Sequence, residues 1–253
     1  MKHFLICLII FTLIGAAQAQ EDPSRATALN DQGVAEYEAK NYEAAIKLFE
    51  EAIGVNSKYA TAYYNLGTAY TRLNENIKAL ECLEKAVELH PRYAEAFSQI
   101  GFIYSETGQY DRAIEFYKRS ISLKALNPVA FRNLGITYVN AGKCKQAINA
   151  LRQAALLGDK AVTVYVNLGF ALASEKEYDD AIAEVRRAVE LEPENKGVRY
   201  FLGTLYMAAK NKAAALNQYI ALREIDIKLA EKLYQAIHSD KLLVITSSGL
   251  TEQ

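Results

Sequence analysis

Few side chains in this sequence are of the types that catalyse reactions or bind metal ions, and the spacing of these few fits no catalytic or metal site. Past the first twenty residues there are two histidines, His90 and His238, and neither stands at a metal-ligand spacing from a cysteine or from the other. Asp179 and Asp180 are adjacent, and neighbouring carboxylates on a helix point apart, as in a solvated first turn. We therefore predict no catalytic, cofactor-binding or metal-binding residue, and we expect that the chain is not an enzyme.

The glycines indicate what positions the remaining residues. They occur singly inside predicted helices, which excludes a phosphate-cradling loop between strand and helix. Six of them recur every 34 residues, as Gly33, Gly67, Gly101, Gly135, Gly169 and Gly203. Alanine recurs at the same interval, as Ala45, Ala79, Ala113, Ala147, Ala181 and Ala215. Because a glycine inside a helix costs about 1 kcal/mol relative to alanine, its regular use predicts close approach of two helices.

Segment 60–93 shows one copy of the repeat. An apolar stripe from Tyr63 to Tyr70 and a second one from Ala79 to Val87 both have helical spacing, with a polar break between them. Each copy is therefore predicted to be a helical hairpin, which must stack on its neighbours to bury its apolar faces.

The order of an aromatic residue, Leu-Gly and Tyr in the first helix, then Gly-x-Tyr-x-x-Ala, resembles the tetratricopeptide repeat (TPR) family. The copies run over 26–59, 60–93, 94–127, 128–161, 162–195 and 196–229. The resemblance implies an all-α, right-handed superhelical solenoid of helix-turn-helix hairpins. Asn127 and Pro128 are predicted to cap and open the first helix of the fourth copy. A further apolar stripe predicts a C-terminal capping helix over 230–243, and the aperiodic segment 244–253 is predicted to be disordered.

The first residues predict export. Lys2 precedes an apolar run over 4–14 that ends in small residues at Ala19, which is the pattern of a cleaved secretory signal over 1–19. A retained anchor is the alternative, but the run is shorter than the roughly 20 residues needed to span a bilayer. We expect a periplasmic or secreted protein without stable membrane insertion after cleavage, in which 20–25 forms a linker.

The first helix of each copy has a second stripe that is not needed for the core. In the family that this chain resembles, that stripe lines a concave groove that grips peptides. The predicted groove contains the side-chain amides Asn65, Gln99, Asn133 and Asn167. It also contains the apolar or aromatic residues Tyr64, Phe102, Ile136, Val166, Phe170, Tyr200 and Phe201, together with Thr68 and Arg132.

Two interpretations of this stripe remain open. The amides resemble a ladder that holds a peptide backbone, yet they also fit hydrogen bonds within or between helices. The apolar side chains mark an interaction site if they are exposed, or ordinary packing if the adjacent helix covers them. Arg132 is the only cation near the amides, so the basic clamp of some family members is not expected.

Charge and cysteine content restrict the partners further. The formal net charge is −1, so we expect no bulk attraction for nucleic acid or for an anionic membrane. Cys82 and Cys144 lie two repeats apart, which places them beyond disulfide distance and predicts free thiols.

The sequence therefore predicts an exported, non-enzymatic scaffold that binds a protein or peptide of unknown identity. A structural assembly or self-association element of an envelope or secretion complex is the alternative.

Overall fold

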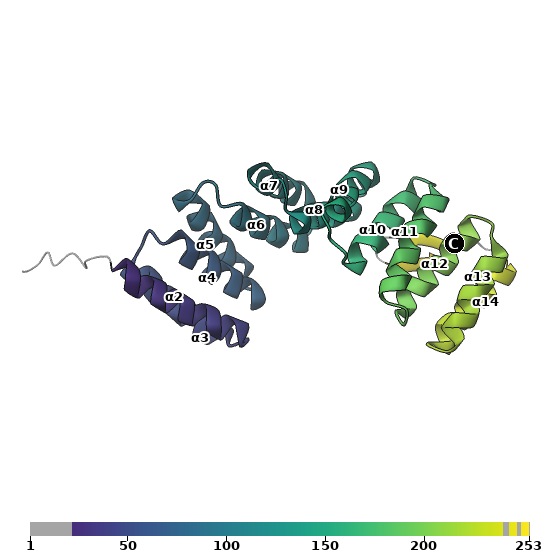
Figure 1. The fold of residues 1–253 in the computed structure, drawn as a ribbon, viewed down its shortest axis with the longest axis horizontal. Coiled ribbons are helices and arrows are strands. Elements are labelled where there is room, and N and C mark those ends of the chain that lie inside the picture. Colours follow the sequence, from purple (N-terminus) through teal and green to yellow (C-terminus); the bar gives the residue numbers. More distant parts are fainter. Residues whose placement is uncertain (1–21, 240–242, 247–248, 253) are drawn as a thin grey trace, which may run out of the picture. The chain divides into compact units, whose positions relative to one another are not determined.

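The computed structural model describes residues 22–239, 243–246 and 249–252 (Figure 1). The predicted signal segment 1–19 lies outside the described residues. The chain forms two compact units, one up to Ile103 and the other from Tyr104 onward. Among the described residues both units are built from α-helices, so the expected all-α fold is confirmed. One short β-hairpin follows the helices.

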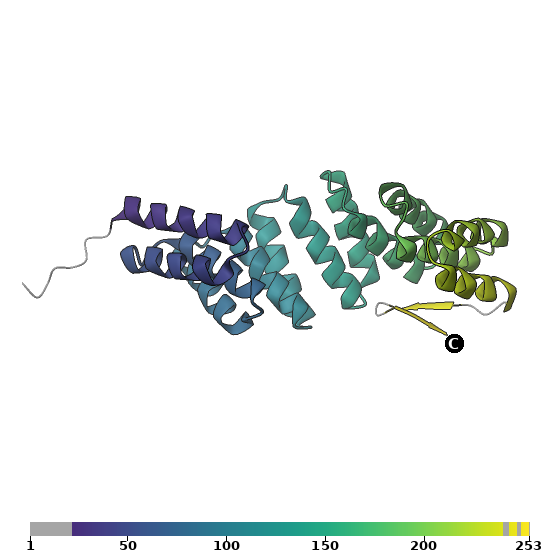
Figure 2. The ribbon, with the colours of Figure 1, turned by 90° about the horizontal axis from the view of Figure 1, so that it is seen from below.

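The first unit contains two complete helix pairs and most of a further helix. Its helices are α2 (Pro23–Glu38), α3 (Tyr42–Val55), α4 (Ala60–Arg72), α5 (Asn76–Leu89) and the greater part of α6 (Ala94–Glu106). Figures 1 and 2 both show α2 and α3 lying side by side. Helix α2 begins at Pro23, within the predicted linker 20–25, because the Asp22 side chain accepts hydrogen bonds from the backbone N–H groups of Ser24 and Arg25.

The second unit continues the same alternation of paired helices. Its helices are α7 (Tyr110–Leu123), α8 (Pro128–Asn140), α9 (Cys144–Leu156), α10 (Val162–Ser174), α11 (Tyr178–Leu191), α12 (Lys196–Ala208), α13 (Lys212–Arg223) and α14 (Ile227–Ser239). Asn127 caps α8 as predicted, with its side chain accepting from the Ala130 backbone N–H at 3.2 Å. The predicted capping helix over 230–243 begins earlier, at Ile227, because Asp226 accepts a hydrogen bond from the Leu229 backbone N–H.

The repeated glycines allow the close helix contacts that the sequence predicts. A Cβ atom on Gly67 would lie 2.7 Å from Leu83 Cγ, and one on Gly135 would lie 2.5 Å from Leu151 Cγ. Real Cβ atoms do not approach other atoms so closely. Gly33 meets Phe49 and Gly169 meets Val185 in the same way, and each partner lies sixteen residues after its glycine.

The last helix pair departs from this rule. Gly203 is approached not by Tyr219, sixteen residues later, but by Leu233 of α14, whose Cδ2 would lie 2.5 Å from an added Cβ. Leu233 belongs to a buried cluster with Tyr200, Ala215, Leu222, Ala230 and Ile237. Helix α14 therefore fills the core of the last hairpin as well as covering it.

A left-handed residue closes the first helix of every pair. Lys40, Asn74, Gly108, Gly142, Lys176 and Lys210 all have φ between 59° and 75°. In each case the next residue donates its backbone N–H to a carbonyl five positions earlier, as Lys143 does to Tyr138 at 2.8 Å. This hydrogen-bond pattern satisfies carbonyls at the helix end and reverses the chain direction. Three of the six positions carry lysine, although glycine adopts this conformation with the least strain.

The described residues of the C-terminal segment 244–253 lie in two strands, where the sequence predicts disorder. The strands β1 (Leu243–Thr246) and β2 (Gly249–Glu252) pair antiparallel, with Leu243 opposite Glu252 and Thr246 opposite Gly249. The sequence Leu-Val-Ile-Thr of β1 has high β-propensity, and this outweighs the absence of a longer periodic pattern.

Candidate functional site

In the first unit, the predicted groove residues of α4 contact other parts of the chain. The Asn65 amide donates to the Asn30 side-chain oxygen at 2.8 Å, and Asn30 is only 4% exposed. The Thr68 hydroxyl donates to the Tyr64 carbonyl at 2.9 Å. Helices α2 and α4 are thus joined by an amide pair, which supports the interpretation that this asparagine bonds between helices. Asn65 retains further hydrogen-bonding capacity, because an amide offers two donors and two acceptor positions.

Tyr64 lies in an aromatic group at the junction of α4 and the loop before α6. Its ring centroid is 5.0 Å from that of Tyr93, and the His90 ring is 5.3 Å from Tyr93. Burial raises the pKa of Tyr64, and it raises the pKa of Tyr93 to about 12. Both hydroxyls are therefore neutral donors at physiological pH. Gln99 and Phe102, on α6, are half-buried.

The predicted amides of the second unit are also engaged within the chain. The Asn133 side chain lies close to the hydroxyl of Tyr117, whose pKa is raised mainly by burial. Asn167 donates to the carbonyl of Thr163, one turn earlier in the same helix, at 2.8 Å. Asn133 thus lies at the contact between α7 and α8. Asn167, like Asn65, is half-buried and keeps a second amide N–H for a ligand.

Arg132 forms an ion pair with Asp159. Its Nη1 donates to both carboxylate oxygens, at 3.0 and 2.8 Å, and the Asp159 side chain is only 6% exposed. Asp159 also accepts a hydrogen bond from the Ala161 backbone N–H at 3.0 Å. The Arg132–Asp159 ion pair connects the loop between α9 and α10 to α8. The charge of the arginine is thus already neutralised by a carboxylate of the same chain.

Four of the predicted apolar groove residues remain partly exposed in the second unit. They are Ile136 on α8, Val166 and Phe170 on α10, and Phe201 on α12, all half-buried. The prediction for Tyr200 is wrong, because its side chain is 4% exposed and packs in the core cluster with α13 and α14. Since α14 packs against α12, it covers the position that faces the groove in the sequence pattern.

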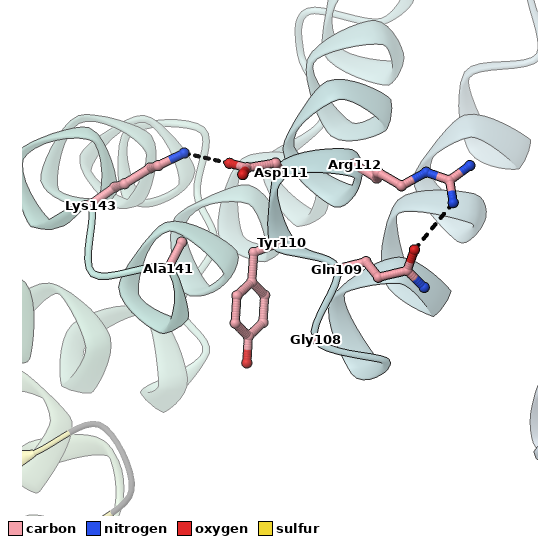
Figure 3. Close-up of a pocket in the computed structure, with 7 residues that line it drawn as sticks. All are labelled: Gly108, Gln109, Tyr110, Asp111, Arg112, Ala141 and Lys143. Atoms are coloured by element: carbon pink, nitrogen blue, oxygen red, sulfur yellow. Dashed lines mark hydrogen bonds and ion pairs between the residues drawn. The ribbon is translucent and has the colours of Figure 1, made fainter.

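A hollow that the sequence reasoning missed lies between two turns of the second unit (Figure 3). It has a volume of about 370 Å³ and is lined by Gly108, Gln109, Tyr110, Asp111, Arg112, Ala141 and Lys143. Lys143 and Asp111 form an ion pair of 2.6 Å across it, and Arg112 donates to Gln109 at 3.1 Å. The signal in the sequence was the pair Gly108 and Gly142, which sets two left-handed turns 34 residues apart.

Reactive groups in the described residues are sparse. No group of three or more His, Cys, Asp or Glu side chains within 22–239 and the two strands is placed to hold a metal ion. Cys82 and Cys144 are free thiols, as predicted. Burial, with a smaller effect from Glu81 and Glu50, raises the pKa of the Cys82 thiol to about 11, which leaves very little of the nucleophilic thiolate at neutral pH. Over the same described ranges, no helix has the length and apolar character needed to cross a membrane.

Comparisons with known proteins agree with the helical repeats. Tetratricopeptide repeat models match residues 24–92, 58–125, 132–195 and 172–237. A search of curated proteins found no match. Among solved structures, the chain is similar to YrrB, a TPR protein with an unusual peptide-binding site, at 26% identity with a TM-score of 0.66, covering 74% of this chain and 97% of YrrB.

Two more distant structures share the fold. PilF of Pseudomonas aeruginosa is 21% identical with a TM-score of 0.72, and the match covers 84% of this chain and 97% of PilF. A chain of the APC/C hetero-tetramer Cut9–Hcn1 is 19% identical with a TM-score of 0.67, over 91% of this chain and 45% of that one. With family models matching over most of the described helices, the chain belongs to the tetratricopeptide repeat family.

Proposed function

We propose that this chain is an exported, non-enzymatic scaffold whose second unit binds a segment of a partner protein through apolar side chains. The family and the likeness to YrrB, whose description includes a peptide-binding site, support a role in protein–protein interaction. The signal pattern over 1–19 supports export to the periplasm or beyond the cell.

The observation that carries this proposal is the composition of the first helices in the second unit. Helices α8, α10 and α12 contain no aspartate or glutamate, and α10 contains no charged residue of either sign. Their partly exposed side chains include Ile136, Val166, Phe170 and Phe201. Partly exposed apolar side chains grouped on successive helices indicate an interaction surface. We expect the bound segment to present apolar side chains to this surface.

Site-specific crosslinking tests the proposal. A photoreactive phenylalanine analogue replaces Phe170, and in a control it replaces Arg186, an exposed residue on the second helix of the same repeat. We expect a specific adduct from position 170 and none from position 186. Equal adducts from both positions, or none from either, would contradict binding at this surface.

Affinity for the partner identified in this way then measures the contribution of single side chains. Phe170→Ala should weaken binding by at least tenfold, because a buried aromatic anchor contributes roughly 2 kcal/mol or more to an interface. Asn167→Ala tests the accessible amide. Asn133 is a poor choice for this purpose, because its loss also changes the surroundings of the buried Tyr117 hydroxyl. Unchanged affinity in Phe170→Ala would refute the proposed site.

Export has its own test. Expression of the full sequence in a host with a secretory pathway, followed by mass spectrometry of the released protein, should give an N-terminus at Gln20. An intact N-terminus in the cytoplasmic fraction would contradict the export proposal without affecting the binding surface.

Self-association is a second candidate function, favoured by exposed apolar side chains on α13 and α14. Ile220 on α13 is 58% exposed. The corresponding position in the other five repeats is charged, as Glu50, Glu84, Lys118, Arg152 and Arg186. Ile227 and Tyr234, on α14, are also exposed, at 60% and 43%. Sedimentation over a wide concentration range should show a dimer that Ile220→Lys removes, and a monomer at all concentrations would exclude this role.

A further inference from the structure

Helix α14 has an exposed stripe in addition to the face that it buries. The buried face fills the core of the last helix pair with Ala230, Leu233 and Ile237. The exposed stripe, called the outer stripe below, consists of Ile227, Glu231, Tyr234 and His238. The steps of four, three and four residues between them place all four side chains on one side of the helix.

The outer stripe departs from what the end of a repeat array requires. A terminal helix needs a polar outer face, because no further repeat covers it. The N-terminal end follows this rule, since no large apolar side chain is exposed within residues 22–59. At the C-terminal end, Ile220, Ile227 and Tyr234 are all exposed. The outer face of α14 and α13 therefore has the character of an interaction surface.

The rings of this surface are already held in place by one another. The Tyr234 ring contacts those of Tyr219, on α13, and His238, with centroid distances of 5.0 and 4.0 Å. His238 Nδ1 donates to the Tyr234 carbonyl oxygen at 2.8 Å, because a carbonyl can only accept. The Arg223 guanidinium lies over the Tyr219 ring at 5.9 Å. Side chains that are fixed in advance lose little conformational entropy when a partner binds.

The outer stripe is complementary to itself when two copies of α14 run antiparallel. A twofold axis midway between Glu231 and Tyr234 brings Glu231 of one copy opposite Tyr234 of the other. The same axis brings Ile227 opposite His238, because both pairs of residues have the same midpoint in the sequence. Within residues 22–239, neither the Glu231 carboxylate nor the Tyr234 hydroxyl has a hydrogen-bond or ion-pair partner. Each group would thus gain the partner that it lacks, as hydroxyl donor and carboxylate acceptor.

We propose that the chain forms a twofold symmetric dimer in which the outer stripe of α14 packs antiparallel against the outer stripe of a second copy. This inference rests on the self-association candidate and names its interface. A second copy fits better than a lipid surface, because Glu231 in the middle of the stripe would be buried in lipid without a donor. Two short helices bury a small area, so we expect a dissociation constant roughly in the micromolar range.

Sedimentation of the whole chain with single substitutions tests the hydrogen bond across the axis. Tyr234→Phe removes only the hydroxyl and keeps the ring beside Tyr219 and His238. It should weaken dimerisation at least tenfold, because the dimer loses two hydrogen bonds to carboxylates and each contributes about a tenfold factor. Lys232→Gln is the matched control, since Lys232 is exposed on the same helix but lies outside the outer stripe. This control should dimerise as the unchanged protein does.

An exchange of two residues tests the antiparallel pairing itself. Tyr234→Glu alone places a second carboxylate opposite Glu231 of the other copy and should also weaken dimerisation at least tenfold. Adding Glu231→Tyr to this variant restores a hydroxyl opposite each carboxylate, because position 231 of each copy meets position 234 of the other. We expect the double variant to recover most of the lost affinity. A double variant with unchanged circular dichroism that stays monomeric would overturn the antiparallel arrangement.

The remaining outcomes separate this interface from the functions proposed above. If the unchanged protein is a monomer at all concentrations, self-association and this interface are both excluded. A dimer that neither Tyr234→Phe nor Tyr234→Glu weakens would overturn the α14 interface and leave self-association through another surface. Phe170→Ala, on α10, should dimerise with unchanged affinity. A loss of the dimer in Phe170→Ala would place the contact between copies in the groove and overturn the α14 interface.

Discussion

Replacing Gly135 with valine should destabilise the second unit, by an amount that follows from the contact with α9. A Cβ at this position would lie 2.5 Å from Leu151 Cγ and 2.8 Å from Leu151 Cδ2, and valine adds two further methyl groups. Overpacking of this kind costs about 1–3 kcal/mol. Valine is a better helix former than glycine by only a few tenths of a kcal/mol. The expected net loss in the free energy of unfolding is therefore about 1–2.5 kcal/mol.

Gly54 provides the matched control, because it is also inside a helix but has no atom within 4 Å of an added Cβ. Gly54→Val should change the free energy of unfolding by less than about 0.5 kcal/mol. Urea titration followed by circular dichroism measures both variants, with the midpoint and slope compared to those of the unchanged protein. A shift in midpoint at constant slope would identify a change in stability rather than in the extent of unfolding.

A double-mutant cycle links the loss to Leu151. Leu151→Ala creates a cavity on its own, but in the Gly135→Val background it makes room for the new methyl groups. The combined loss should be smaller than the sum of the two single losses by at least about 1 kcal/mol. Additive losses, or a Gly135→Val variant as stable as Gly54→Val, would refute the close contact between α8 and α9.

Three further substitutions test separate features. Ser120→Ala removes a buried hydroxyl without a hydrogen-bond partner, at a position where four other repeats carry alanine. This variant should raise the free energy of unfolding, measured in urea, by about 1 kcal/mol. A decrease would show that the hydroxyl forms a hydrogen bond in solution. Lys176→Gly relieves a φ of 65° and should raise the same free energy by about 0.5–1 kcal/mol, so the absence of a gain would mean that the turn carries no strain. The pKa of Asp226 is lowered by the Lys196 ammonium and by the Leu229 N–H, so its stabilising effect is present above its ordinary value of 3.8 and is lost as the pH falls through the folded value. Asp226→Asn should therefore lower the urea midpoint at about pH 7 and have little effect near about pH 2, and equal differences at both pH values would contradict this assignment.

The helical framework could be predicted from the sequence because each copy repeats the same register. A glycine and an alanine at fixed places specify which faces meet, and the helices begin and end close to the expected positions. The left-handed residues were not anticipated, since Lys40, Lys176 and Lys210 give no sign of a positive φ. Only comparison with Asn74 and Gly108, one and two repeats after Lys40, reveals that this position of the repeat requires a positive φ.

The repeat pattern predicts a candidate site on the first helices but does not predict the hydrogen bonds of its side chains. The pattern placed Asn65, Asn133 and Asn167 on equivalent turns, but it could not show that Asn65 and Asn167 have hydrogen-bond partners within the chain. The partner of Asn65 is Asn30 on another helix, and the approach of Asn30 to Asn65 is a tertiary property. Tyr200 was misplaced for a related reason, because α14 covers a position that is open in a regular repeat.

The contact between Gly203 and Leu233 determines where the number of repeats can change. In an ordinary copy, a side chain from the second helix of the same hairpin fills the space beside the glycine. An extra copy inserted between α9 and α10 would therefore meet neighbours of the usual shape. After α13 an added copy would compete with α14 for the space beside Gly203. Gene duplication and protein engineering are therefore expected to lengthen this array from within, with the last pair and α14 kept together as one inseparable terminal module.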